Sequence, residues 1–209
     1  FLVNKLNKSK FCHFKKNKIN EYLINKYNLV INCDFNNLIT KKFFSKKIKK
    51  DYVSYAHTSI ITHKKLLNNN IAVQVFTEIG PLAFLPVSPT ETSVVYSARG
   101  KKKLDLKTVV KNQNTKYKIK KLTKTHFFDL KLSNLRNYYY KNVLAFGDLL
   151  HKIHPLAGQG FNMSIRDIKE LVGLIKFKIN HGLEINTSIC KDFEKNTKHK
   201  NYIFSNGID

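Results

Sequence analysis

The stretch Asn142–Asp167 reads NVLAFGDLLHKIHPLAGQGFNMSIRD and decides the fold of the chain around it. It opens with the apolar run Val143–Phe146, whose length and composition are typical of a buried β-strand. Gly147 and Asp148 follow at the carboxyl end of that strand, where ligands dock in α/β sheets. A loop with Gly158-Gln159-Gly160 then leads into an amphipathic helix, and such glycines let backbone N–H groups approach a ligand closely. Spacing alone also fits a simple tight connection between a strand and a helix.

The complete string is more informative than its spacing. GDLLHKIHPLAGQGFNMSIRDIKEL resembles the third flavin-binding motif of class A flavoprotein monooxygenases. Within that class it is most similar to the ubiquinone-biosynthesis aromatic hydroxylases, whose motif runs GDAAH-x-IHPLAGQG-x-N-x-x-x-RD. The matching positions are Gly147, Asp148, His151, Ile153, His154, Pro155, Leu156, Ala157, Gly158, Gln159, Gly160, Asn162, Arg166 and Asp167. So many matches at fixed spacing are hard to obtain by chance.

This resemblance implies a site for FAD, with NAD(P)H as the reductant and an aromatic ring with a polyprenyl tail as the substrate. It assigns to Asp148 a hydrogen bond with the ribityl chain, and the competing interpretation is a turn or N-cap carboxylate. It also implies that Pro155 and the glycine loop lie beside the flavin ring, where backbone N–H groups stabilise negative charge. The expected cofactor-binding residues are Gly147, Asp148, Pro155, Gly158, Gln159, Gly160, Asn162 and Asp34, and no catalytic side chain is expected.

A second, weaker match lies near the start of the chain. The short run Leu29–Ile31 predicts a strand, and Asp34 aligns with the aspartate of the family motif ADG-x-x-S-x-x-R. Phe35, Leu38 and Lys41 stand where that motif has Gly, Ser and Arg. Because Phe does not easily adopt a positive φ, the turn is either altered or no longer used.

The middle of the chain indicates an antiparallel sheet. Strand-like runs at 71–77, 82–87 and 93–97 are separated by short turns, and VQVFTEIGPLAFLPVS resembles the substrate-domain signature of the same family. Val73, Val75, Phe84 and Leu85 are candidates for an apolar pocket wall, or equally for plain core.

We therefore expect an α/β (α+β mix) chain: part of a FAD/NAD(P)-binding Rossmann-like domain with an inserted antiparallel-sheet substrate domain. Residues 1–50 would be a remnant of the FAD-binding domain with the degenerate motif, 51–135 the substrate domain, and 136–209 the C-terminal part of the FAD-binding domain. In the last region the apolar positions recur in steps of three and four, which predicts a helix stripe that packs in the core. This stripe consists of Phe161, Ile165, Ile168, Val172, Ile175 and Ile179.

The chain contains no GxGxxG fingerprint for the pyrophosphate of FAD. Its eight glycines lie at 80, 100, 147, 158, 160, 173, 182 and 207. A fragment of a longer protein, a split gene product whose partner chain supplies the missing N-terminal segment, and a decayed remnant are three open explanations. By itself this chain should not be a working oxygenase, because the pyrophosphate contacts are missing.

Composition restricts the remaining possibilities. The net charge is +24, but only three of the 38 basic residues are Arg, so a lysine-biased surface is favoured over specific nucleic-acid binding. Attraction to an anionic membrane surface is the next interpretation. The family resemblance adds a ubiquinone-biosynthesis complex as an expected partner. We expect a cytoplasmic location, peripheral at the inner face of the membrane. The three cysteines form no CxxC pair, and His151 and His154 have no third ligand nearby in sequence, so no metal site is expected. The alternative function is a lysine-rich binding module that docks on an anionic surface.

Overall fold

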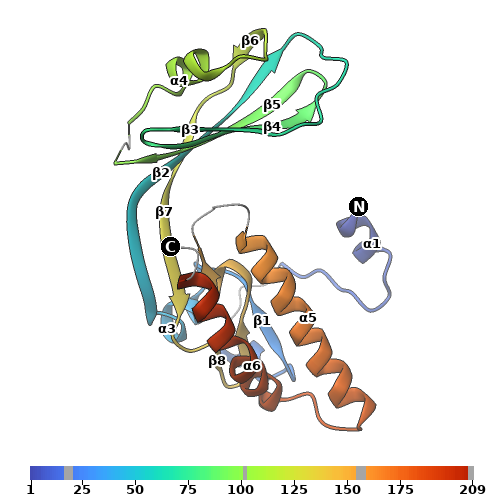
Figure 1. Cartoon of the computed structure of the whole chain (residues 1–209). Helices are drawn as coiled ribbons and strands as arrows, with labels where there is room; N and C mark the ends of the chain where they lie inside the picture. Colours follow the sequence, from blue (N-terminus) through green and yellow to red (C-terminus); the bar gives the residue numbers. More distant parts are fainter. Residues whose placement is uncertain (17–20, 101–102, 154–158, 207–209) are drawn as a thin grey trace.

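The computed structural model describes residues 1–16, 21–100, 103–153 and 159–206, which form two sheets of unequal size (Figure 1). A three-stranded sheet with two long helices makes up the lower lobe, and a seven-stranded sheet lies above it (Figure 1). The predicted mixed α/β class is confirmed. The helices are α1 (Leu2–Asn7), α2 (Glu21–Ile24), α3 (Leu38–Phe43), α4 (Leu106–Gln113), the 3₁₀ turn η1 (Gly147–Leu149), α5 (Gln159–Asn180) and α6 (Thr187–Asn206).

The lower lobe is built on a parallel pair of strands. β1 (Val30–Asn32) lies beside β9 (Val143–Ala145), and β8 (Tyr139–Tyr140) pairs with the other side of β9. All three residues of β9 are buried, as expected for the central strand of a sheet that α5 and α6 cover. The strand predicted at 143–146 is therefore confirmed. The hydrophobic core of the lower lobe includes Leu144, Leu149 and, from α6, Phe193.

The upper sheet is antiparallel, as the turn signals indicate. Its strands follow the order β10 (His151–Lys152), β7 (His126–Leu135), β2 (Lys47–His63), β5 (Glu91–Arg99), β4 (Gly80–Ser88) and β3 (Val73–Thr77), with β6 (Ile119–Leu122) also on β2. The long strands β2 and β7 run from the upper sheet down to the lower lobe and connect the two (Figure 1). The boundary expected at 50/51 falls inside β2, and the one at 135/136 falls at the end of β7.

One face of the upper sheet packs under α4. The alternation of β5 buries Val94 and Tyr96 on that face, where they meet Leu106 and Val110 of the helix. Three of the four candidate pocket-wall residues lie on this side, because Phe84 is in the core, Val75 packs against it, and Val73 pairs with Phe84. Leu85 lies on the opposite, exposed face.

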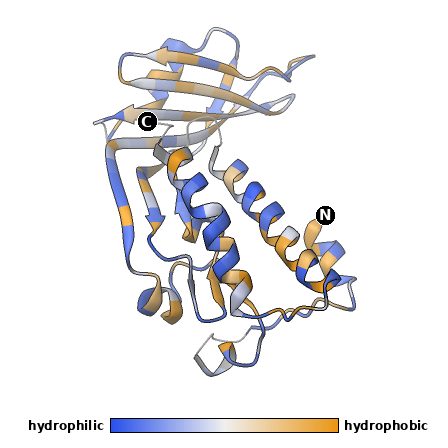
Figure 2. Ribbon diagram, turned by 60° about the horizontal axis from the view of Figure 1, so that its bottom comes forward, coloured by the Kyte–Doolittle hydropathy of each residue, from blue (hydrophilic) through white to orange (hydrophobic). Residues whose placement is uncertain are grey.

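The apolar stripe of α5 is where the sequence prediction is wrong. The helix forms as expected, and apolar segments recur along it (Figure 2). Its buried face, however, consists of Met163, Asp167 and Leu171, with Leu174 and Ile175 partly buried beside them. Five of the six stripe residues are solvent-exposed in the described structure: Phe161 73%, Ile165 47%, Ile168 46%, Val172 42% and Ile179 59%. Periodicity identified residues that share a face of the helix, but no other element of the described structure covers that face.

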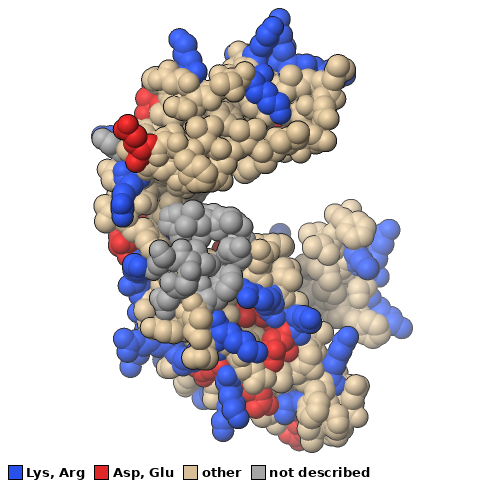
Figure 3. All heavy atoms as spheres, viewed as in Figure 1, with Lys and Arg blue, Asp and Glu red and all other residues tan. Residues whose placement is uncertain are grey.

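Two further features complete the fold. Among the described residues, no helix is both long and apolar enough to cross a membrane. Lys and Arg gather on the top of the upper sheet and around the lower lobe, while the underside of the upper sheet is free of them in this view (Figure 3).

A tight hairpin between β3 and β4 supplies a test of the upper sheet. Gly80 has φ +144°, and a Cβ placed there would lie 1.9 Å from the carbonyl oxygen of Ser97. Gly80→Ala should therefore lower the free energy of unfolding by about 3 kcal/mol or more, through backbone strain and overlap. Gly100→Ala is the matched control, because Gly100 has φ +65° but open space around it, and it should cost about 1–2 kcal/mol. Urea unfolding measures both, and equal losses would contradict the packing around Gly80.

Candidate cofactor site

The carboxyl ends of β1 and β9 lie side by side and bring two distant segments together. Asn32 pairs with Ala145, and the backbone N–H of Phe146 donates to the carbonyl oxygen of Asn32 at 2.9 Å. Cys33 and Asp34 follow the first strand, and Gly147 and Asp148 follow the second. Both candidate aspartates are solvent-exposed at this edge of the sheet. Ligands bind at this end of parallel strands, so the predicted residues from the two motifs share one suitable location.

An electrostatic interaction shows how close the two turns are. The thiol of Cys33 is solvent-accessible, but the surrounding protein partly desolvates it, and this effect raises its pKa. The negative charge of Asp148 raises the pKa of Cys33 further. The turn after β9 therefore lies within electrostatic reach of the turn after β1.

The Gly147-Asp148 turn needs its glycine for backbone reasons. Gly147 has φ +61°, a conformation that side chains disfavour, although a Cβ there would meet nothing within 4 Å. Leu149 and Leu150 are buried directly after it, and the N–H of Leu150 donates to the carbonyl oxygen of Gly147 at 2.9 Å. This anchoring leaves the carboxylate of Asp148 free on the outside, where it can accept hydrogen bonds from a ligand.

The turn after β1 differs from the one that the family motif implies. Phe35 is exposed and does not adopt a positive φ, so the turn does not use the conformation that a glycine there would allow. The carboxylate of Asp34 accepts from the N–H of Asn36 at 2.8 Å, and the carbonyl oxygen of Asp34 accepts from the hydroxyl of Thr40 at 2.5 Å. The side chain of Asn32 adds a donor bond to Thr40 Oγ1 at 2.8 Å. These local bonds make Asp34 a turn-stabilising residue.

The glycine loop is described only at its end. His154, Pro155 and Gly158 lie outside the described residues, and Gln159 is described as backbone at the start of α5. Gly160 lies in the first turn of α5, where a Cβ would make an ordinary 3.6 Å contact with Ile153 Cγ1. Asn162 is exposed in the same turn. The turn that holds Asp148 packs against α5, because η1 and this helix are in contact.

A buried side-chain pair, His151 and Asp167, connects β10 to α5 beside this site. The spacing of these residues in the sequence gave no reason to expect the contact. Nε2 of His151 lies 2.5 Å from Oδ2 of Asp167, and both side chains are almost fully buried. Oδ1 of Asp167 accepts from Nδ2 of Asn201 at 3.2 Å, so α6 shares the pair. The pair therefore holds β10 against α5. Both residues match the family motif, but only the structure shows that they touch.

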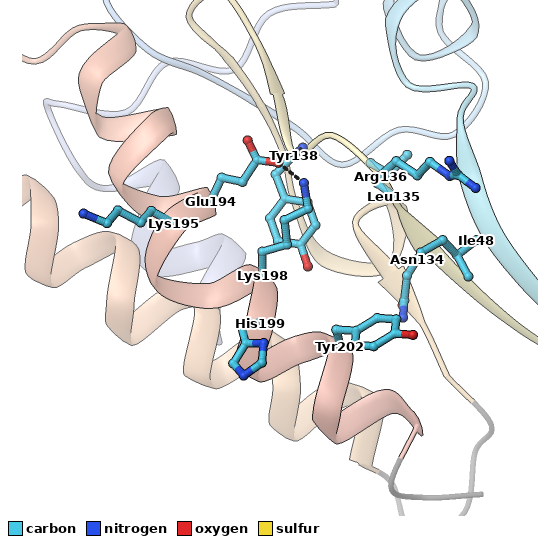
Figure 4. A pocket seen from close by; sticks show the side chains of 10 residues that line it. All are labelled: Ile48, Asn134, Leu135, Arg136, Tyr138, Glu194, Lys195, Lys198, His199 and Tyr202. Atoms are coloured by element: carbon cyan, nitrogen blue, oxygen red, sulfur yellow. Dashed lines mark hydrogen bonds and ion pairs between the residues drawn. The ribbon is translucent and has the colours of Figure 1, made fainter.

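Among the described residues, two buried polar atoms in this region have no hydrogen-bond partner: Nδ1 of His151 and Oδ1 of Asn134. His151 and Asn134 are direct partners on β10 and β7, so their side chains lie on one face. Asn134 also lines a cavity of about 660 Å³ between the end of β7 and α6 (Figure 4). None of the predicted cofactor residues that the structure describes lines this cavity. Its described walls are Ile48, Asn134, Leu135, Arg136, Tyr138, Glu194, Lys195, Lys198, His199 and Tyr202. Within the described part of the chain, no three His, Cys, Asp or Glu residues are grouped to hold a metal ion.

Comparison with known proteins supports the family resemblance. No family model matches the chain. It is 24% identical over 231 aligned residues to ubiquinone biosynthesis monooxygenase COQ6 of Schizosaccharomyces pombe, which covers 87% of this chain and 48% of the relative. It is 27% identical over 151 residues to 3-demethoxyubiquinol 3-hydroxylase of Escherichia coli, covering 65% of this chain and 37% of that one. The chain thus spans about half the length, or less, of these relatives.

Solved structures share the fold. PqsL of Pseudomonas aeruginosa, a probable FAD-dependent monooxygenase, gives a TM-score of 0.60 at 14% identity and covers 81% of this chain and 51% of that one. The myxobacterial FAD-dependent halogenase CndH gives a TM-score of 0.63 at 11% identity, covering 87% and 46%. The sequence relatives and these neighbours together confirm the predicted resemblance to class A flavin hydroxylases.

The contact between the two turns can be tested on the chain as it stands. Asp148→Asn removes the negative charge that helps to raise the pKa of Cys33, so more thiolate forms at pH 8 and iodoacetamide should alkylate Cys33 faster. Cys12 is an internal control whose rate should stay the same. Burial raises the pKa of Cys190 to about 12, so this thiol should remain unmodified in the folded protein. Peptide mass spectrometry measures the alkylation of all three cysteines. An unchanged rate at Cys33 would show that Asp148 is not close enough to influence this thiol.

The buried pair should matter strongly for stability. Asp167→Ala leaves Nε2 of His151 and Nδ2 of Asn201 without their acceptor, and breaking such a buried pair costs about 3–5 kcal/mol. Lys198→Ala is the control, because it removes an exposed pair with Glu194 that is worth about 0.5 kcal/mol. Urea unfolding of the lower lobe should separate the two variants clearly. Equal unfolding midpoints would show that the His151–Asp167 pair contributes little.

Proposed function

We propose that this chain, a homologue of the ubiquinone-biosynthesis flavin monooxygenases, provides the flavin-ring half of an FAD-dependent aromatic hydroxylase. The observation that carries the proposal is the edge where β1 and β9 end together. There the exposed Asp148 belongs to η1, which packs against α5. We further propose the division into residues 1–50, 51–135 and 136–209, in which the first and last regions together hold the cofactor and the middle one covers it.

The residues at this edge fit FAD. Asp148 is solvent-accessible and can accept hydrogen bonds from ribityl hydroxyls. The first turn of α5 has unpaired backbone N–H groups and a positive dipole end, which suit the electron-rich edge of the ring. The described residues do not require a glycine at position 160, since a Cβ there meets only an ordinary contact among them. A glycine there is therefore better explained by close approach of a ligand than by internal packing.

When bound and reduced by NAD(P)H, FAD supplies the oxygen-transfer chemistry, and the protein supplies position and a dry environment. His151 and Asp167 contribute by holding the strand before the glycine loop to the helix after it. The altered turn at Asp34 and Phe35 supports a different or weaker arrangement for the reductant than the family motif implies.

An apolar aromatic substrate fits the underside of the upper sheet. On this face Ala56 pairs with Ser97, Thr58 with Val95, and Leu85 with Ser93. The side chains of these residues are small or medium-sized, uncharged and partly apolar. The start of α5 lies below it (Figure 1). We propose that a phenol with a polyprenyl tail, the ubiquinone precursor that the relatives suggest, lies between them, and that Leu85 replaces Val73, Val75 and Phe84 as the wall residue.

The lysine-rich surface supports a peripheral position on an anionic membrane, which is where a polyprenylated substrate is found. The relative from S. pombe is named as a mitochondrial protein, and the expected cytoplasmic location of this chain stays a prediction. The altered turn at Phe35 also favours a second candidate, an inactive remnant that keeps the fold and uses its charge to dock on an anionic surface.

The decisive experiment is a titration with FAD of the 209-residue chain, alone and co-expressed with a segment that carries GxGxxG. The pair should bind FAD and oxidise NAD(P)H, whereas the chain alone should not. In the pair, Asp148→Ala should weaken FAD binding by about 1.5–3 kcal/mol, or roughly tenfold to a hundredfold. Asp129→Ala, which removes an exposed carboxylate from β7, should leave the affinity unchanged. Equal affinity for the Asp148 variant would remove that residue from the site, and no FAD bound to the pair would favour the remnant.

A further inference from the structure

One long stretch of this lysine-rich chain contains no basic residue. Lys and Arg account for 38 of the 209 residues, yet none occurs between Lys65 and Arg99, and no other gap between two basic residues is as long. The stretch supplies β3, β4 and nearly all of β5, and the underside of this sheet shows no Lys or Arg in Figure 3. In a chain whose solvated faces are covered with lysine, their absence here indicates a surface that is not simply solvated.

The outer edge of this region is β3, the last strand on its side of the upper sheet. No strand of the described structure pairs with its outer edge. The strand reads VQVFT and follows Ile71 and Ala72, so this segment holds no charge, no Pro and no Gly. Phe76 is 80% exposed. Proteins commonly protect a sheet edge with charged side chains, as β6 of the same sheet does with Lys120 and Lys121, and β3 lacks this protection.

The register with β4 shows which backbone groups of β3 point outward. Phe76 lies opposite Pro81, which has no N–H, so these two residues form a pair without backbone hydrogen bonds. The N–H and C=O of Phe76 therefore face the open edge. Because this direction alternates along an antiparallel strand, the same groups of Gln74, and of Ala72 just before the strand, face it as well. These three positions can bond to a further strand.

We propose that β3 pairs with β3 of a second copy of this chain, antiparallel about a twofold axis at Gln74. In this register the two Gln74 residues exchange backbone hydrogen bonds with each other, and Ala72 of each copy exchanges them with Phe76 of the other.

The charge of the chain favours a second copy as the partner. A twofold axis brings identical surfaces together, and each copy carries a net charge of +24. Two copies can meet along a strand free of Lys and Arg without placing positive charges against each other. An acidic partner would instead favour the lysine-rich faces. Strand pairing of this kind needs no flavin, so it is tested separately from the cofactor site.

The register makes Gln74 the position at which a charge acts most directly. Residues opposite each other in an antiparallel pair lie on one face of the sheet, with Cβ atoms about 4.5–5.5 Å apart. The two Gln74 side chains would therefore lie next to each other at the axis. Gln74 is exposed and lies opposite Ala83 of β4, so a substitution there leaves the core under α4 intact.

Sedimentation equilibrium of the full chain tests the pairing, and it should show a dimer of twice 24.3 kDa. Gln74→Lys and Gln74→Glu each place like charges opposite each other, and each should raise the dimer Kd by about tenfold or more. An equimolar mixture of the two variants should return the Kd to within about threefold of the native value, because opposite charges then meet across the axis. Asn112→Lys is the matched control, since it adds the same charge at an exposed position of α4, and it should change the Kd less than about twofold. Far-UV circular dichroism confirms that each variant remains folded.

Amide exchange measured by NMR gives a second readout. The N–H groups of Gln74 and Phe76 should become protected as the protein concentration rises. Those of Val73 and Val75 point towards β4 and should be protected at every concentration. Added NaCl should lower the dimer Kd, because it screens the repulsion between two strongly positive copies.

Three outcomes would overturn the pairing. The first is a monomer at all concentrations, or a dimer whose Kd is the same for the Gln74 and Asn112 variants. The second is a dimer that Ile168→Lys abolishes and Gln74→Lys does not, which would assign the contact to the exposed stripe of α5. The third is failure of the mixed Gln74 variants to associate, which would exclude the antiparallel register about this residue.

Discussion

Parallel pairing of β1 with β9 is the interaction on which the rest of the structure depends. Val30 and Val143 lie far apart in the chain, so closing this loop costs entropy that local contacts do not repay. Burial of β9 between β1, β8 and the helices offsets that cost. Once the two strands are in register, the turns that follow them meet at one edge. The candidate cofactor site is a direct consequence of that register.

The second constraint is the long antiparallel pair of β2 and β7. These strands belong to the upper sheet for most of their length, yet their lower ends reach the lobe that holds the proposed cofactor site. β10 adds to the lower end of β7 and leads towards the glycine loop, so the position of that loop is coupled to the upper sheet. The bond between His151 and Asp167 then ties β10 to α5. A ligand between the sheet and the start of α5 would therefore have both of its walls fixed by one continuous framework.

The solvent-exposed surface has three regions of different chemical character. The lysines are spread over solvated faces and say little about a specific partner (Figure 3). The apolar stripe on α5 is different, because apolar residues in a regular row beside an unpaired strand edge are a costly surface to leave in water. The underside of the upper sheet is a third kind of surface, on which small, hydroxyl and apolar side chains of β2, β4 and β5 lie side by side.

Local periodicity and glycine placement were sufficient to predict β9, the turn at Gly147, the helix that follows and the antiparallel middle region. The sequence also indicated the resemblance to flavin monooxygenases, since fourteen motif positions match in one stretch. Only the tertiary structure decided which faces are covered. A period of three to four groups Phe161 with Ile168, but whether a neighbour lies over them depends on distant segments. The same holds for Val75 and Phe84, which face α4, and for His151 and Asp167, whose contact comes from the packing of a strand on a helix rather than from any spacing that a sequence displays.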